Sequence, residues 1–170
     1  MFALKLPNMP LVGCWLAEDY QEQGMSPVVV ARRNPEDNRL AVAVFLCDLL
    51  CLGVKDAFFE PCLNDDQLDT ILDQQSQEMQ KITYDKAREI ILGAVKYADD
   101  LGIQPHPDYA EAKATIEPDK PFQYKKTRYG KNGKPFYYAG PYDNLYTILE
   151  KLEETVGPNN FTYVIDESLL

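Results

Sequence analysis

The first third of the chain alternates short apolar runs with clusters of turn-forming residues. Residues 28–31 read Val-Val-Val-Ala, residues 40–46 read LAVAVFL, and residues 34–38 between them contain Asn, Pro, Glu and Asp. Two apolar runs on either side of such a cluster predict a pair of antiparallel strands. The second run is apolar throughout, which is typical of a strand buried on both faces. Residues 11–16 (LVGCWL) predict another strand.

The middle of the chain has helical periodicity. In residues 84–101 the apolar side chains recur at intervals of three and four, which predicts an amphipathic helix. Thr83 precedes this helix as an N-cap residue, and Gly102 follows it where a left-handed C-cap residue is expected. Residues 64–79 predict a second helix with a narrow apolar stripe, and residues 107–114 a shorter one.

The last third combines an aromatic hairpin with one more helix. Residues 123–129 and 134–139 flank the sequence Gly-Lys-Asn-Gly, and Asn-Gly is the strongest short signal for a β-hairpin. Residues 144–156 predict a helix, and residues 161–165 (FTYVI) a final strand. Residues 49–59 (LLCLGVKDAFF) fit either a strand or a short helix.

Strands therefore gather at both ends of the chain around a helical middle. This order predicts an α+β fold. We expect a single domain over residues 1–170 with N-terminal antiparallel strands, central helices, a C-terminal β-hairpin, a helix and a final strand. A chain of 170 residues can bury roughly two thirds of its unfolded surface, which is enough for a core without disulfides or metal.

The cysteines and the lack of long apolar stretches indicate the cellular compartment in which we expect the protein. The four cysteines are Cys14, Cys47, Cys51 and Cys62, too few for a disulfide framework. The longest apolar stretch is too short to span a bilayer, and the first ten residues do not resemble a signal peptide. We therefore expect a soluble cytoplasmic protein with reduced thiols and no membrane partner.

Charge is distributed unevenly along the chain. The formal net charge is −10, but residues 119–134 carry +5, while residues 1–118 carry −10 and residues 135–170 carry −5. The overall acidity argues against general nucleic-acid binding, because a polyanion is repelled at long range. A local basic contact is still compatible with this charge, because salt screens interactions beyond about 10 Å.

The basic, tyrosine-rich segment is the main candidate binding surface. Its candidate contact residues are Lys125, Lys126, Arg128, Tyr129, Lys131, Lys134, Tyr137, Tyr138 and Tyr142. Tyrosine and arginine are enriched at protein interfaces, so the segment suits contact with another protein. A ribbon of this composition can also stack bases and follow the phosphates of RNA or single-stranded DNA. In the structural alternative, the tyrosines pack on helices and the lysines protect an edge strand.

Metal and catalytic candidates have structural alternatives. Cys47 and Cys51 are four residues apart, and Cys14, Cys62 and His106 could complete a zinc set with them. Cys47 and Cys51 lie in an apolar run, however, which favours buried structural thiols. Asp48 follows seven apolar residues, so a buried carboxylate there would need a partner, either Lys55 or one of Arg32, Arg33 and Arg39. The chain has no glycine-rich phosphate loop, and we predict no cofactor.

Three segments resemble parts of uncharacterised bacterial proteins. They are residues 45–59 (FLCDLLCLGVKDAFF), residues 90–109 (IILGAVKYADDLGIQPHPDY) and residues 133–144 (GKPFYYAGPYDN). The resemblance covers about a quarter of the chain. It implies a bacterial intracellular setting and no particular fold, activity or site residue.

These observations favour a non-catalytic protein–protein interaction or regulatory module. Opposite charge blocks on one small chain can orient a partner, and they would also permit self-association into a homo-oligomer. Nucleic-acid binding through residues 120–142 is the second hypothesis. A metal-dependent enzyme that uses Cys47, Cys51, Asp48 or His106 is the third.

Overall fold

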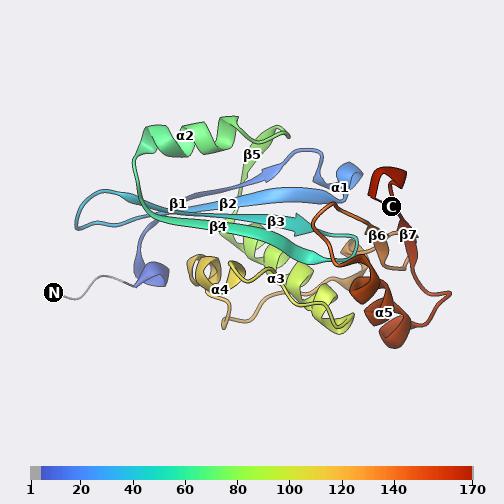
Figure 1. The fold of residues 1–170 in the computed structure, drawn as a ribbon. Coiled ribbons are helices and arrows are strands. Elements are labelled where there is room, and N and C mark those ends of the chain that lie inside the picture. The colour runs from blue at the N-terminus through green and yellow to red at the C-terminus, as the bar shows by residue number, and fades with distance from the viewer. Residues whose placement is uncertain (1–4, 170) are drawn as a thin grey trace.

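Five antiparallel strands form the sheet around which the rest of the chain is arranged (Figure 1). The computed structural model describes residues 5–169. The strands are β1 (Leu11–Ala17), β2 (Met25–Arg33), β3 (Leu40–Asp48), β4 (Gly53–Leu63) and β5 (Met79–Ile82), in the order β4-β3-β2-β1-β5. The predicted α+β class with N-terminal antiparallel strands is confirmed, and residues 53–59 belong to a strand.

β2 and β3 are buried on both faces, which confirms the prediction made for residues 40–46 and extends it to β2. Successive side chains of a strand point to opposite faces of the sheet. Val28, Val30, Ala43 and Phe45 enter the larger core, whereas Val29, Ala31, Leu40 and Val42 enter a smaller one with Leu68. We call these two sides the α3 face and the α2 face, after the helix that covers each of them.

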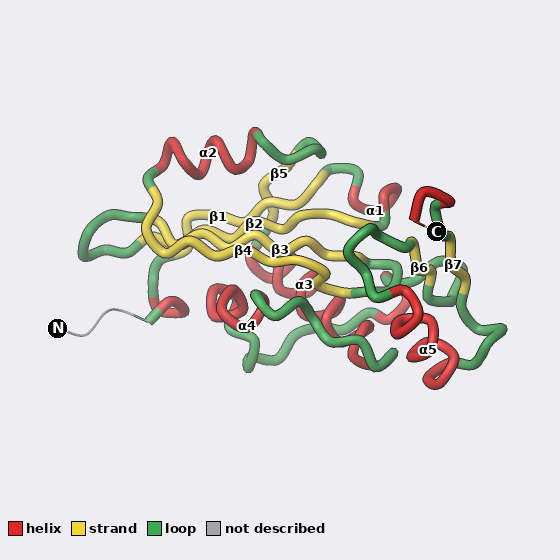
Figure 2. The backbone as a smooth tube through the Cα atoms, in the orientation of Figure 1, coloured by secondary structure: helices red, strands yellow, loops and turns green. Residues whose placement is uncertain are grey.

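Helices cover the two faces unequally (Figures 1 and 2). The α3 face carries α3 (Tyr84–Asp100), α4 (Tyr109–Ala112) and α5 (Leu145–Val156), while the α2 face carries α2 (Asp65–Asp73). The short helix α1 (Tyr20–Gln23) joins β1 to β2. No helix among residues 5–169 is both long enough and apolar enough to cross a membrane.

The strongest predicted helix forms with both of its expected ends. Thr83 caps α3 by accepting the Lys86 N–H through its side chain, and Gly102 has φ +77° just after the helix. α2 begins with a capping box between Asn64 and Gln67. It is shorter than the predicted 64–79, because residues from Met79 onward pair with β1 and form an edge of the sheet.

The prediction of a C-terminal hairpin is wrong for its two strands, and only the turn forms as predicted. Asn132 and Gly133 have φ +55° and +76°, and Lys131 and Lys134 form an antiparallel bridge around them. Residues 123–129 nevertheless form no strand, and β6 (Phe136–Tyr138) instead pairs in parallel with β7 (Thr162–Val164). The Asn-Gly pair therefore specifies a turn and not a ribbon.

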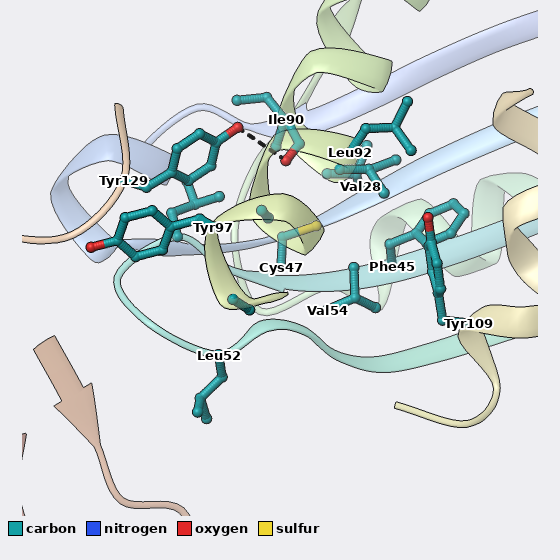
Figure 3. Packing of buried hydrophobic residues seen from close by; sticks show 14 of the residues in the cluster. Val28, Phe45, Cys47, Leu52, Val54, Ile90, Leu92, Tyr97, Tyr109 and Tyr129 are labelled. Carbon is teal, nitrogen blue, oxygen red and sulfur yellow. Dashed lines mark hydrogen bonds between the residues drawn. The ribbon is translucent and has the colours of Figure 1, made fainter. Parts of the chain in front are cut away.

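Contacts outside the hairpin separate its two arms. The Gly130 N–H donates to the Leu49 carbonyl and the Phe136 N–H to the Leu50 carbonyl, both at 2.9 Å. Tyr129 packs on α3, where its hydroxyl lies 2.9 Å from the Glu89 carbonyl and 3.4 Å from the Ile90 carbonyl, the second of which is drawn in Figure 3. Both arms thus bind the β3–β4 turn and α3 instead of each other.

Two buried arginines hold the segment that precedes these arms. Arg88 donates to four backbone carbonyls, those of Ile116, Glu117, Lys120 and Pro121. Arg32 donates to the carbonyls of Met9 and Thr115. The guanidinium groups of Arg32 and Arg88 both lie over the Tyr84 ring. These contacts satisfy polar groups that would otherwise be costly to bury.

Two neighbouring tyrosines offer a test of how the basic segment is held on α3. Tyr129→Phe removes a buried hydrogen bond and should lower the free energy of unfolding by about 1 kcal/mol. The buried Tyr124 hydroxyl has no hydrogen-bond partner among residues 5–169. Tyr124→Phe should therefore leave stability unchanged or raise it slightly. Urea unfolding of the two variants would measure the difference, and equal losses would contradict this description.

Candidate functional site

The structure separates the tyrosines of the predicted contact surface. Tyr129 is 4% exposed and Tyr137 is fully buried, and the Tyr137 hydroxyl donates to Asp143 Oδ2 at 2.9 Å. Tyr138 and Tyr142 are 55% and 98% exposed. Only Tyr138 and Tyr142 can therefore contact a partner, whereas Tyr129 and Tyr137 belong to the core, as the structural alternative holds.

The basic residues of the same segment differ in their surroundings. Arg128 lies 3.5 Å from the Glu89 carboxylate, and the Lys134 ammonium donates to the Asn159 carbonyl at 3.1 Å. The Lys131 ammonium lies over the Phe136 ring. Lys125 and Lys126 are exposed and form no ion pair within residues 5–169. The nine candidate residues thus do not make one continuous surface.

The largest concave surface involving these residues lies where β3 and β6 end. A first hollow of about 680 Å³ separates the start of β2 and the end of β3 from β6 and residues 75–77. Its apolar lining residues are Met25, Pro27, Leu46, Leu50, Phe136 and Tyr138, and its polar ones include Asp19, Asp48, Gln75 and Gln77. This hollow includes one of the two exposed tyrosines.

Two further hollows adjoin the first. One of about 490 Å³ lies between Leu46, Lys55, Asp56 and His106 on one side and residues 140–143 on the other. Another of about 420 Å³ lies between Met25, Tyr138 and Asp166. Leu46 lines the first and second hollows, Met25 and Tyr138 line the first and third, and Lys55 lines the second and third. We call this continuous surface the Leu46 groove.

The apolar floor of the groove is exposed because α2 covers only part of its face. Leu46 lies between Phe45 and Cys47, which both point into the α3-face core, so Leu46 points to the α2 face. It is half-buried, and Phe58, which shares this face through pairing with Val44, is exposed. The smaller core under α2 contains neither Leu46 nor Phe58. An apolar strip of the sheet is thus left to solvent.

Asp48 forms one end of the groove and holds the turn between β3 and β4. Its two carboxylate oxygens accept the N–H groups of Leu50 and Leu52, at 2.9 and 3.2 Å. Burial raises the pKa of Asp48 to about 6, although these donors and the charge of Lys55 act in the opposite direction. The structural partners of this carboxylate are therefore mainly backbone groups, and the predicted Lys55 acts only through its charge.

The turn at residues 140–143 forms the opposite wall. Asp143 Oδ2 accepts both the Gly140 N–H at 2.7 Å and the Tyr137 hydroxyl at 2.9 Å. A side chain on Gly140 would approach the Lys55 ammonium at 3.3 Å, so Lys55 lies against this turn. The buried Tyr137 therefore contributes to the site indirectly, by positioning the loop that carries the exposed Tyr142.

The cysteine and histidine candidates for metal binding do not come together. Cys47 and Cys51 are buried, Cys47 among Val28, Phe45 and Ile90 (Figure 3). Burial raises the pKa of both thiols, which disfavours the thiolates that metals bind. Among residues 5–169, the grouping of three ligand-type residues around His106 contains Asp56 and Asp108 and no cysteine.

Hydrogen bonding also argues against metal at His106. His106 Nδ1 accepts the Asp108 N–H at 3.1 Å, and a neutral imidazole that accepts at Nδ1 carries its proton on Nε2. That nitrogen lies 3.9 Å from Asp56 Oδ1, and its lone pair is not free for a metal ion. The arrangement is typical of a histidine that holds a turn before a short helix.

Sequence reasoning did not find the groove, because its lining comes from six separate parts of the chain. The sequence signalled parts of it, through Asp48 at the end of an apolar run and through the predicted contact residues Tyr138 and Tyr142, but not that these parts meet. Comparisons of the chain with models of protein families, with curated proteins and with solved structures found no match. The function is therefore inferred from the geometry and the charge of the site.

The raised pKa of Asp48 predicts a specific dependence of stability on pH. An acid whose pKa is higher in the folded state binds more protons when folded, so stability falls as pH rises from about 4 to about 6. The loss reaches at most about 3 kcal/mol, since one pKa unit is worth about 1.4 kcal/mol. Asp48→Asn should remove this fall, even if the asparagine makes the protein less stable at every pH.

Urea unfolding between pH 4 and pH 7 would measure the effect. Asp69→Asn, at an exposed position of α2, is the matched control for loss of one carboxylate. If the wild type and the Asp48→Asn variant lose stability in parallel between pH 4 and pH 6, Asp48 is not the buried acid described above.

Proposed function

We propose that this protein is a non-catalytic protein-interaction module that binds a polypeptide segment of its partner in the Leu46 groove. The observation that carries the proposal is the apolar lining through which the three hollows adjoin, formed by Leu46, Met25 and the exposed Tyr138. Exposed apolar surface bordered by polar groups is characteristic of interaction sites.

The shape of the groove supports a polypeptide occupant. A small-molecule site usually encloses most of its ligand in one pocket. Here the hollows adjoin along the surface, and the tyrosines at their rim, Tyr138 and Tyr142, are 55% and 98% exposed. A tyrosine contributes large contact area with few rotatable bonds, which suits a rim that closes over an extended ligand. A chain with side chains spaced along it can use several hollows at once.

The chemistry of the lining supports binding over catalysis. The carboxylates of Asp48 and Asp143 already accept two hydrogen bonds each, Asp48 from N–H groups of its own turn and Asp143 from the Gly140 N–H and the Tyr137 hydroxyl. A general base needs an oriented proton acceptor within reach of its substrate, and these groups are occupied with holding the walls. We also propose that the protein acts in a reducing compartment such as the bacterial cytoplasm, and its four free cysteines support that setting.

Selection from a library of displayed random peptides tests the proposal. Peptides retained by the wild-type protein should bind the Tyr138→Ala variant at least about tenfold more weakly, the effect expected of a central aromatic contact. Tyr146→Ala is the matched control, because Tyr146 is 77% exposed on α5 and does not line the groove. It should bind the selected peptides as the wild type does.

A second substitution tests the floor of the groove separately from its rim. Leu46→Glu introduces a charge into the apolar strip and should also abolish binding of the selected peptides. Thermal unfolding followed by circular dichroism would verify that each variant is folded. If no peptide is retained, or if the retained peptides bind the Tyr138→Ala, Leu46→Glu and wild-type proteins equally, the Leu46 groove is not a peptide-binding site.

A further inference from the structure

Carboxylates line every part of the Leu46 groove. Asp19 and Asp48 lie in the first hollow, Asp56 and Asp143 in the second, and Asp166 in the third. The corresponding cationic groups are Lys55 and, when it is protonated, His106. Taken as a whole, the groove therefore carries more carboxylates than cationic groups.

Most of these carboxylates are held by neutral donors, which leave their charge uncompensated. Asp19 Oδ1 accepts the Gln77 side-chain amide, Asp56 Oδ1 accepts the Ala57 N–H, and Asp166 Oδ1 accepts the Ser168 N–H. A carboxylate has about four acceptor positions, so each of these groups can accept further donors. The donors also fix the carboxylates in place before any ligand arrives.

Lys55 neutralises only part of this charge. Its positive charge lowers the pKa of Asp48, and its ammonium lies beside the turn at residues 140–143. It also lines the second hollow with Asp56 and Asp143 and the third with Asp166, so a single lysine faces the five carboxylates of the groove. The field at the mouth of the groove is therefore negative and will attract a cationic partner.

From this charge we infer that the ligand of the Leu46 groove is a basic segment of another protein, with lysine or arginine on both sides of an apolar side chain. The inference rests on the proposed function and specifies its partner. The apolar side chain lies on Leu46, Met25 and Tyr138. The flanking cations bind Asp19 at one end and Asp56 or Asp166 at the other.

Binding of the ligand as an added strand at the β4 edge of the sheet is less well supported than binding in the groove. Strand addition needs free backbone N–H groups along an edge. On the edge strand β4, the Ala57 N–H already donates to Asp56, and Pro61 has no N–H. The Val54 carbonyl accepts the His106 N–H. This edge is protected in the way that natural sheets avoid unwanted pairing, so recognition falls to side chains in the groove.

Three matched peptides test the charge of the ligand. In the first, lysines alternate with leucine and phenylalanine over about ten residues; in the others every lysine is replaced by glutamine or by glutamate. Fluorescence anisotropy should show the lysine peptide binding at least about tenfold more tightly than the glutamine peptide, and no binding of the glutamate peptide. Raising NaCl from about 20 to about 200 mM should weaken the binding of the lysine peptide.

Charge variants connect this preference to the groove. The Asp19→Asn/Asp166→Asn double variant should bind the lysine peptide about tenfold more weakly than the wild type and lose most of the salt dependence. Glu111→Gln/Glu154→Gln is the matched control, since both residues are exposed, on α4 and α5, and lie outside the groove. This control should bind the lysine peptide as the wild type does.

The outcomes separate the inference from the proposed function. If display selects peptides that depend on Tyr138 but are neutral or acidic, the groove binds polypeptides and the inference of a basic ligand is wrong. If the lysine peptide binds equally to the wild type, the Tyr138→Ala variant and the aspartate double variant, it binds nonspecifically and the inference is also wrong.

A second copy of the chain would be a different occupant, since its own Lys125 and Lys126 are exposed. Sedimentation of the wild type and of Lys125→Glu/Lys126→Glu decides this point. Self-association that this lysine variant abolishes would overturn the inference of a heterologous partner. A monomer whose sedimentation is the same with and without the substitutions supports it.

Discussion

The structure depends on the buried carboxylate of Asp48 and the turn that it organises between β3 and β4. A buried charge is costly unless hydrogen bonds compensate it, and here the N–H groups of Leu50 and Leu52 do so. The carbonyl groups of the same turn accept hydrogen bonds from the C-terminal part of the chain. Leu49 accepts the Gly130 N–H and Leu50 accepts the Phe136 N–H. The C-terminal part of the chain is thereby attached to the sheet.

The Leu46 groove follows from this attachment. Because β6 is bound at Leu50, Tyr138 lies over the end of the α2 face, where α2 itself does not reach. The face keeps an exposed apolar strip between two covered regions. Parallel pairing of β6 with β7 then brings residues 166–168 to the third hollow. The concave surface is thus made by the meeting of the sheet with its C-terminal layer.

Positively and negatively charged side chains have different roles in this protein. Arg32 and Arg88 are buried and donate to backbone carbonyls, and Arg128 lies beside Glu89 on α3. These arginines hold the chain together. In the groove, the half-buried Asp19 and the exposed Asp166 are fixed by neutral donors. A net charge of −10 therefore has a local consequence at the groove, where a cationic partner would be attracted and oriented.

The sequence by itself determined those elements whose signals are local. The apolar runs at 28–31 and 40–46 specify the central strands, because a short apolar run next to turn-forming residues suits a strand that is covered on both faces of a sheet. The three-and-four spacing over residues 84–101, with Thr83 before it and Gly102 after it, specifies α3. The order of these elements was enough for the α+β class. The Asn-Gly pair likewise specified its turn.

Only the tertiary structure decided what the basic, tyrosine-rich segment does. Its composition fits an exposed ribbon as well as a buried layer, and the choice depended on partners far away in the chain: Glu89 for Tyr129, Leu49 for Gly130 and Leu50 for Phe136. The groove was hidden from the sequence for the same reason. Its lining comes from six segments that come together only when the sheet and the C-terminal layer pack against each other. Periodicity along the chain predicts helices and strands but not which of them are in contact.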